Sequence, residues 1–113
     1  MKIIKETSTR GELKALATNL FGDMVKAVVD VDMEIIALDA ELHSDLEALL
    51  LKEGSKQNSL WGINLYPELQ GDQFVEFDSM INMRPSQGNR SRGVESEQTR
   101  KKVLDVVARR IKG

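Results

Sequence analysis

Hydrophobic positions in the first third of the chain change from a helical to a strand spacing. A short apolar stretch at Lys2 to Lys5 predicts an edge strand, and apolar residues then recur along one helical face: Leu13, Leu16, Ala17, Leu20 and Phe21. Thr9 and Glu12 match a capping box before this face, and Gly22 is placed to end the helix. From Val25 to Val31 the period becomes two, which predicts a strand with one well-buried face.

The middle of the chain continues this strand into a hairpin and then a short helix. Met33 to Leu38 predicts the second strand, joined to the first near Asp32, although the turn lacks the Asn-Gly or Asp-Gly pair typical of tight hairpins. Ser44 and Glu47 match a second capping box, which predicts a helix over residues 45–53. The alternative is that the apolar run Ala48 to Leu51 forms a buried strand, because a short apolar run does not distinguish a helix from a strand.

The second half of the chain predicts another hairpin and a terminal helix. Leu60 to Tyr66 is expected to form a strand, with Phe74 to Met83 as its hairpin partner, and the polar residues 84–93 are expected to form a loop. From about Ser96 the apolar residues again follow one helical stripe. These elements predict one α+β domain over residues 1–113: a two-layer arrangement in which an antiparallel sheet of two hairpins, with or without the N-terminal strand, packs against the N- and C-terminal helices.

Composition narrows the chemistry that this domain can perform. The 113 residues are 41% hydrophobic, enough for one domain with a real core. The chain has no cysteine, which excludes disulfides, thiolate zinc sites and a cysteine nucleophile, and its single histidine excludes any site that needs two imidazoles. The first residues lack the apolar stretch of a secretory signal, and no apolar run is long enough to cross a membrane. We therefore expect a cytoplasmic protein without a membrane partner.

The near-neutral total charge hides a division between two parts of the chain. Residues 1–83 carry 7 basic and 15 acidic side chains, a net charge of −8, whereas residues 84–113 carry 9 basic and 3 acidic side chains, a net charge of +6. Such an asymmetry can indicate a surface that meets an anionic partner. It can equally come from two faces of one domain that attract each other.

Three stretches resemble a known family in the same order along the chain. They are Glu41 to Leu51 (ELHSDLEALLL), Leu60 to Pro67 (LWGINLYP) and Phe77 to Val94 (FDSMINMRPSQGNRSRGV). Together they resemble a small prokaryotic family of single-domain proteins described only as a domain of unknown function. The resemblance extends over essentially the whole chain and implies a complete single-domain protein. It brings no activity and no catalytic residues, so the functional argument depends on the chemistry of the side chains.

The segment Arg84 to Gly93 is the first candidate site. It contains three arginines, two serines and two glycines, and no carboxylate. Guanidinium groups bind phosphate or carboxylate through paired hydrogen bonds, and glycines let backbone amides turn toward an anion. We therefore predict an anion site whose ligand bears a phosphate, with these binding residues: Arg84, Ser86, Asn89, Arg90, Ser91 and Arg92. The alternative is a loop whose arginines pair with the domain's own carboxylates.

Two specific nucleotide-binding motifs are absent from this segment. Gly88 and Gly93 have the spacing of a phosphate-binding P-loop, but Val94 stands where that loop needs its lysine, and no dinucleotide fingerprint is present. Nucleic acid is a weaker candidate partner, because the basic segment has no aromatic side chains on which bases could stack.

His43 is the second candidate site. Acidic residues surround it in the sequence or on the predicted strand: Glu41, Asp45, Glu47, Glu76 and Asp78. The histidine could act as a general base oriented by an acid, or join carboxylates around Mg²⁺ or Mn²⁺. A hydrogen-bonded histidine at a helix start is the structural alternative and the one we favour. The candidate catalytic residues are His43, Glu41 and Asp78, and we assign no metal ligand and no cofactor.

The sequence leaves three functions open. The first is an anion-binding module that uses the Arg84–Gly93 loop. The second is an enzyme acting on phosphoesters, which requires His43 to lie within about 10 Å of that loop, since one bound substrate must reach both. The third is a protein-interaction or structural domain without a small ligand. A homo-oligomer is compatible with each of them, and the sequence does not decide whether the protein is an enzyme.

Overall fold

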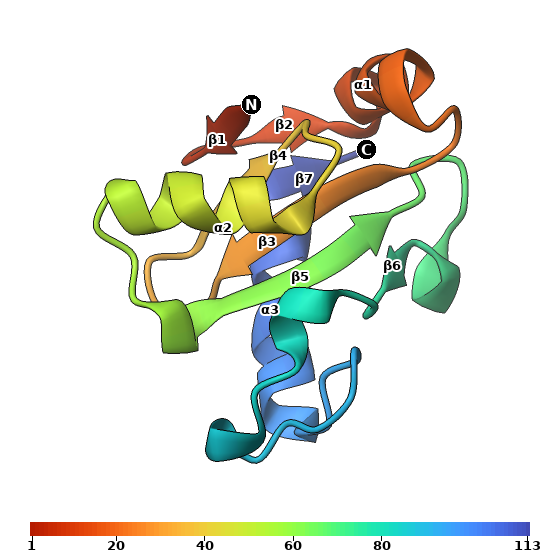
Figure 1. The fold of residues 1–113 in the computed structure, drawn as a ribbon. Helices are drawn as coiled ribbons and strands as arrows, with labels where there is room; N and C mark the ends of the chain where they lie inside the picture. Colours follow the sequence, from red (N-terminus) through yellow and green to blue (C-terminus); the bar gives the residue numbers. More distant parts are fainter.

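A five-stranded antiparallel sheet forms the centre of the molecule. The computed structural model describes all 113 residues and is shown in Figure 1. The strand order across the sheet is β1-β4-β3-β5-β6. The strands have these bounds: β1 Lys2–Ile4, β3 Val25–Asp30, β4 Ile35–Leu38, β5 Leu60–Leu65 and β6 Val75–Glu76. The predicted N-terminal edge strand is thereby confirmed as β1, which pairs with β4.

Three helices cover the sheet. α1 (Arg10–Leu20) and α3 (Glu97–Arg110) contribute to the larger hydrophobic cluster on one face, and α2 (His43–Lys52) packs on the other. The α+β class is confirmed, as is the packing of the N- and C-terminal helices on one side of the sheet. Since both faces are covered, β3, β4 and β5 are hydrophobic at nearly every position; the charged or amide exceptions are Lys26, Asn64 and Asp30, the last at the end of β3.

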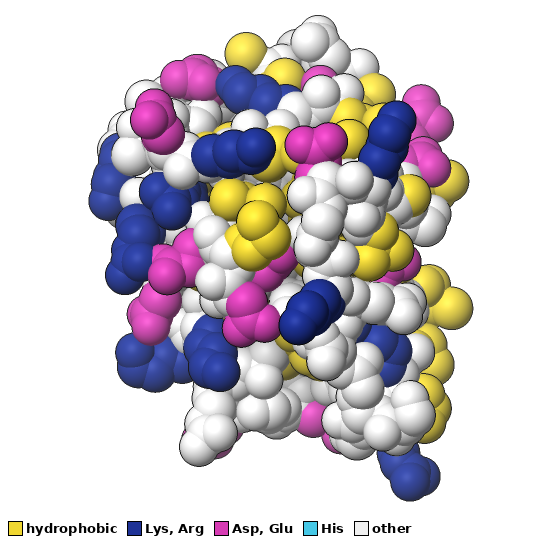
Figure 2. Space-filling view, turned by 90° about the vertical axis from the view of Figure 1, so that its left-hand side faces the viewer, with side chains coloured by type: hydrophobic (Ala, Val, Ile, Leu, Met, Phe, Trp, Pro, Cys, Tyr) yellow, Lys and Arg dark blue, Asp and Glu magenta, His cyan; other side chains and the backbone are white.

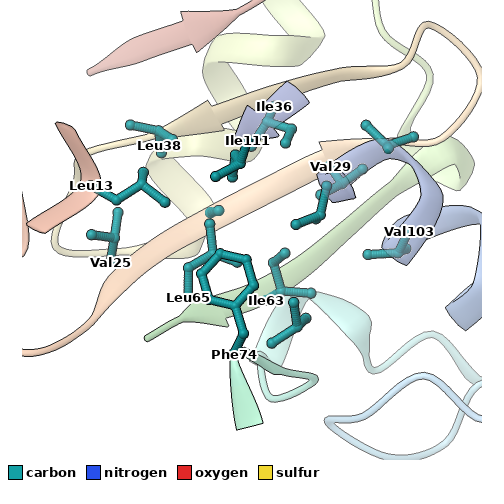
Figure 3. Close-up of a cluster of buried hydrophobic side chains, with 14 of the residues drawn as sticks. Leu13, Val25, Val29, Ile36, Leu38, Ile63, Leu65, Phe74, Val103 and Ile111 are labelled. Carbon is teal, nitrogen blue, oxygen red and sulfur yellow. The ribbon is translucent and has the colours of Figure 1, made fainter. Parts of the chain in front are cut away.

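The larger core lies between the sheet and α1 and α3. Figure 3 shows side chains of α1 and α3, such as Leu13 and Val103, meeting side chains of the sheet, such as Val29 and Ile63, in this layer. Ala27 and Val29 belong to this cluster, whereas Val28 points to the α2 side and joins the smaller one. This alternation follows from the period of two along a strand. It also places Lys26, two residues before Val28, on the α2 face.

The hairpin between β3 and β4 closes without the usual glycine. The carboxylate Oδ1 of Asp30 accepts hydrogen bonds from the backbone amides of Asp32 and Met33, both at 2.9 Å. Glu34 takes a positive φ of 57° at the end of the turn. The buried Asp30 carboxylate thus supplies the turn with partners for its amides.

The predicted strand from Phe74 to Met83 is wrong beyond Glu76. A side chain takes the place of the missing strand: the amide of Asn82 accepts a hydrogen bond from Gly62 N at 2.8 Å and donates to Gly62 O at 2.9 Å. Ser79 packs directly over Gly62, where a Cβ atom would lie 2.5 Å from the Ser79 Cβ. The chain therefore leaves the sheet after β6 and forms a short 3₁₀ turn at Met80–Asn82.

The two predicted capping boxes have different outcomes. Thr9 caps α1, since its hydroxyl accepts a hydrogen bond from Glu12 N at 3.1 Å. Ser44 does not cap α2, because that helix begins one residue earlier at His43 and has no side-chain cap. A two-residue parallel pair of β2 (Ser8–Thr9) and β7 (Ile111–Lys112) joins the beginning and end of the chain.

Candidate functional site

Arg84 lies inside the structure and serves the fold. Its guanidinium donates to the carbonyl oxygens of Gln57 and Leu60 and stacks over the ring of Trp61, with 4.2 Å between the guanidinium carbon and the ring centroid. The residue is only 9% exposed, and burial lowers its pKa. Its two terminal nitrogens are directed to backbone carbonyls and its buried Nε has no hydrogen-bond partner, so the geometry does not support the expected role of Arg84 as an anion ligand.

Asn89 is likewise used by the loop itself. Its Nδ2 donates to the carbonyl oxygens of Asn82 at 2.7 Å and Gly93 at 2.8 Å, while its Oδ1 accepts from Glu95 N at 2.9 Å. Because the side chain is buried and has partners on both sides, it fixes the path of the loop.

The side-chain carboxylate of Glu95 binds backbone amides of the loop that were expected from the sequence to bind an external anion. Glu95 accepts hydrogen bonds from the backbone amides of Arg90 at 2.6 Å and Ser91 at 2.9 Å. The hydrogen bond from the Arg90 amide has the largest effect on the pKa of Glu95 and lowers it, and the bond from the Ser91 amide lowers it further. The backbone amides of the loop therefore already bind an anionic group of the chain itself.

The remaining loop residues do not converge on one site. Ser86 and Arg90 are exposed, and the hydroxyl of Ser91 accepts from Gly93 N. Arg92 turns the other way and forms an ion pair with Asp78, with 2.7 Å between its Nε and the Asp78 Oδ1. The face seen in Figure 2 mixes basic and acidic side chains, without an extended basic surface. Of the predicted set, Arg92 alone enters a cleft that also holds the second candidate site.

This cleft has a volume of about 510 Å³ and lies beside the start of α2, on the α2 face of the sheet. We call it the His43 cleft. Its charged and hydrogen-bonding residues come from five separate parts of the chain: Lys26, His43, Ser44, Asn64, Tyr66, Glu76, Asp78, Ser79 and Arg92. Its apolar lining is Met24, Leu42, Met80 and Ile81. His43 and the loop residue Arg92 thus line the same cleft.

Three polar side chains cross the floor of the His43 cleft in one row. Lys26 on β3 is the register partner of Asn64 on β5, which is the partner of Glu76 on β6. Residues paired across adjacent strands project from the same face of a sheet. A cation, an amide and a carboxylate therefore follow one another across three strands.

His43 is held in one tautomer. Its Nε2 lies 2.8 Å from the carbonyl oxygen of Ile63, and since a carbonyl can only accept, Nε2 carries the proton and Nδ1 is the basic nitrogen. Burial, with a smaller effect of Lys26, lowers the pKa of His43, while its bond to Ile63 and the charge of Asp78 oppose this shift. The imidazole is therefore neutral at neutral pH.

Asn64 is buried and only partly satisfied. Its Nδ2 donates to Glu76 Oε1 at 2.9 Å and to the backbone oxygen of Asp78 at 3.3 Å, which fixes the orientation of the amide. Its Oδ1 is buried and has no hydrogen-bond partner. The hydroxyl of Tyr66 also donates to Glu76 Oε1, at 3.1 Å, and burial together with Glu76 raises the pKa of Tyr66.

The structure brings only some of the candidate residues around His43 together. Asp78 lines the cleft with His43, whereas Glu41 is exposed and does not line it. No group of three or more His, Asp and Glu side chains is arranged to hold a metal ion. Sequence reasoning missed Lys26 and Asn64, although a polar residue within each of two nearly apolar strands was a usable signal.

The protein is thus a small α+β domain, and a cleft on its α2 face is lined by both basic and acidic side chains. The chain belongs to the family described as Protein of unknown function (DUF5674), which it matches over residues 2–110. No curated protein and no solved structure matches it. None of its helices has the length and hydrophobicity needed to cross a bilayer.

Proposed function

We propose that the protein is a binding module for a small ligand with an anionic group, which the His43 cleft holds through Lys26 and Arg92. The observation that carries this proposal is the position of Lys26. It is the one charged side chain of β3 that faces the cleft, and it has no carboxylate partner. Its Nζ lies instead 5.2 Å from the centre of the Phe21 ring.

Arg92 supplies the second cation. It uses Nε for Asp78, which leaves the other guanidinium nitrogens available to bind a phosphate or carboxylate. The proposed anion site thus moves from the loop amides, which Glu95 fills, to the cleft beside the loop. A small ligand is favoured over nucleic acid, since Arg84 is buried and the cleft is bounded by carboxylates. The absence of cysteine supports a reducing, cytoplasmic setting.

Calorimetric titration with inorganic phosphate and with acetate tests this proposal. The variants Lys26→Met and Arg92→Gln should each weaken binding about tenfold, as expected for loss of one charge-assisted hydrogen bond. The matched controls are Lys14→Met and Arg90→Gln, which remove exposed cations outside the cleft. If only Arg90→Gln loses affinity, the anion binds to the Arg84–Gly93 loop and not in the cleft, and the proposal is wrong. The proposal is also refuted if neither anion binds at millimolar concentrations.

A phosphoester-cleaving enzyme is the second candidate. It is favoured by one observation: the basic Nδ1 of His43 belongs to a ring that lines the same cleft as Arg92 and Asp78. In that role water would attack the phosphorus and pass its proton to Nδ1 of His43, the bond from phosphorus to the ester oxygen would break and release the leaving group as its oxyanion, and Lys26 and Arg92 would bind the phosphate. Hydrolysis of 4-nitrophenyl phosphate that disappears in His43→Asn would support this function. Equal rates in both proteins would exclude it.

A further inference from the structure

The charges of the His43 cleft are incompletely paired. Arg92 and Asp78 form an ion pair with each other. Glu76 receives hydrogen bonds only from neutral groups, the Asn64 amide and the Tyr66 hydroxyl, and no cation lies within ion-pair distance of it. Lys26 has no carboxylate partner. The cleft therefore holds one uncompensated cation and one uncompensated carboxylate, and these two do not neutralise each other.

The register of the sheet fixes where these two charges lie. Lys26 and Glu76 are both paired with Asn64, from opposite sides. Adjacent strands are about 4.8 Å apart, so the backbones that carry the cation and the carboxylate are separated by about 10 Å. A ligand lying across β5 would meet the positive end of the row over β3 and the negative end over β6.

Asn64 occupies the middle of the row and is fixed there. The residue is only 6% exposed, and its Oδ1 is buried. The amide is held in one orientation, because Nδ2 faces the acceptors Glu76 and Asp78. The middle of the row is therefore a fixed neutral group that separates the cation from the carboxylate.

The rim of the cleft offers apolar contacts. Leu42 and Met80 line it and are 55% and 65% exposed, which is unusual for large apolar side chains. Both would lose contact with water if an aliphatic part of a ligand lay between them. The cleft thus offers a cation, a separate carboxylate and an apolar rim.

We infer that the ligand of the His43 cleft is a small zwitterion whose two charges stand at opposite ends of a short chain, such as an ω-amino acid, with its carboxylate toward Lys26 and its ammonium toward Glu76. This inference rests on the proposed function and deepens it by naming the ligand class. The ammonium supplies the positive charge that Glu76 lacks. A simple anion such as phosphate satisfies Lys26 but leaves the other half of the row unpaired.

Titration with ligands of matched length tests the inference. The zwitterions are glycine, 4-aminobutanoate and 6-aminohexanoate, and each is compared with the carboxylate and the amine of the same chain length. At neutral pH the best zwitterion should bind at least tenfold more tightly than its carboxylate and its amine. Its preferred length reports the separation between the two ends of the row.

The variant Glu76→Gln identifies the ammonium site. Glutamine keeps an acceptor for Asn64 and Tyr66 but removes the charge, so the affinity for the zwitterion should fall to that for the carboxylate, while binding of the carboxylate is retained. Glu68→Gln, which changes an exposed carboxylate outside the cleft, is the matched control and should have no effect. Fluorescence of the single Trp61 during urea unfolding checks that both variants fold.

The two proposals fail separately. If carboxylate and zwitterion bind equally well, or if Glu76→Gln has no effect on either, the zwitterion inference is wrong while the anion site stands. If the amine binds as tightly as the zwitterion, Lys26 takes no part and both proposals are wrong. Absence of binding by phosphate, carboxylates and zwitterions alike also refutes both.

Discussion

Asn82 should be among the most important polar residues for stability, because its side chain replaces a strand. The amide makes three hydrogen bonds to buried or partly buried backbone groups: Gly62 N, Gly62 O and the Arg92 carbonyl oxygen, at 2.8, 2.9 and 2.9 Å. The residue itself is completely buried. Asn82→Ala leaves all three groups without their partner, in an interior that offers no replacement.

The expected loss in the free energy of unfolding is about 3 kcal/mol, at roughly 1 kcal/mol for each hydrogen bond. With a urea m-value of about 1.5 kcal/mol per molar, the midpoint should fall by about 2 M. Urea unfolding followed by Trp61 fluorescence measures this shift. The control Asn19→Ala removes an exposed helical asparagine without a hydrogen bond from its side chain and should change stability by less than about 0.5 kcal/mol.

A variant that separates the two functions of the amide makes the test sharper. Asn82→Asp keeps an acceptor for Gly62 N but loses the donor to Gly62 O and to the Arg92 carbonyl oxygen, and it brings a charge into a buried site. It should be at least as destabilising as the alanine variant. The reasoning is refuted if Asn82→Ala costs less than about 1 kcal/mol, since the amide would then not support the sheet edge.

Three further predictions concern packing and pH. Gly62→Ala should cost about 1–3 kcal/mol, because its Cβ would lie 2.5 Å from the Ser79 Cβ; adding Ser79→Gly should recover part of the loss, and additive effects in urea unfolding would contradict this contact. Because the pKa of His43 is lowered by burial, the unfolded chain takes up its proton first, so stability should decline as pH falls below about 6.5; a His43→Gln variant with an unchanged pH profile would exclude this origin. Because the pKa of Glu95 is also lowered, its contribution should be complete above about 4.5 and be lost as pH falls through the folded-state pKa. Glu95→Gln should therefore lose stability at neutral pH and converge with the parent protein in acid, and a constant difference in thermal melting across this range would count against the ionised carboxylate.

The elements that could be predicted are those whose pattern depends on local spacing. α1, β3 and α3 have one clear apolar period and lie where this period predicts them. The end of β6 could not be predicted in the same way. It depends on the contact between Gly62 and the Asn82 side chain, which are 20 residues apart and leave no periodic signal.

The candidate sites were predicted in part for the same reason. A segment rich in arginine and free of acids indicates anion binding only if no carboxylate reaches it, and Glu95 lies two residues beyond the acid-free segment Arg84 to Gly93. Arg84 could not be distinguished from Arg92 by composition, although one stacks on Trp61 inside the fold and the other lines the cleft. The combination of His43, Asp78 and Arg92 in one cleft depends on how α2 lies on the sheet, which single-sequence patterns do not determine.

Mapping of backbone amide shifts by NMR during a phosphate titration tests the central claim most directly. The amides of Lys26, Asn64 and Arg92 should shift together with one saturating curve, while those of Arg90 and Ser91, which Glu95 holds, should stay in place. Saturable shifts confined to Arg90 and Ser91 would contradict the account, because they would place the anion on the loop rather than in the His43 cleft.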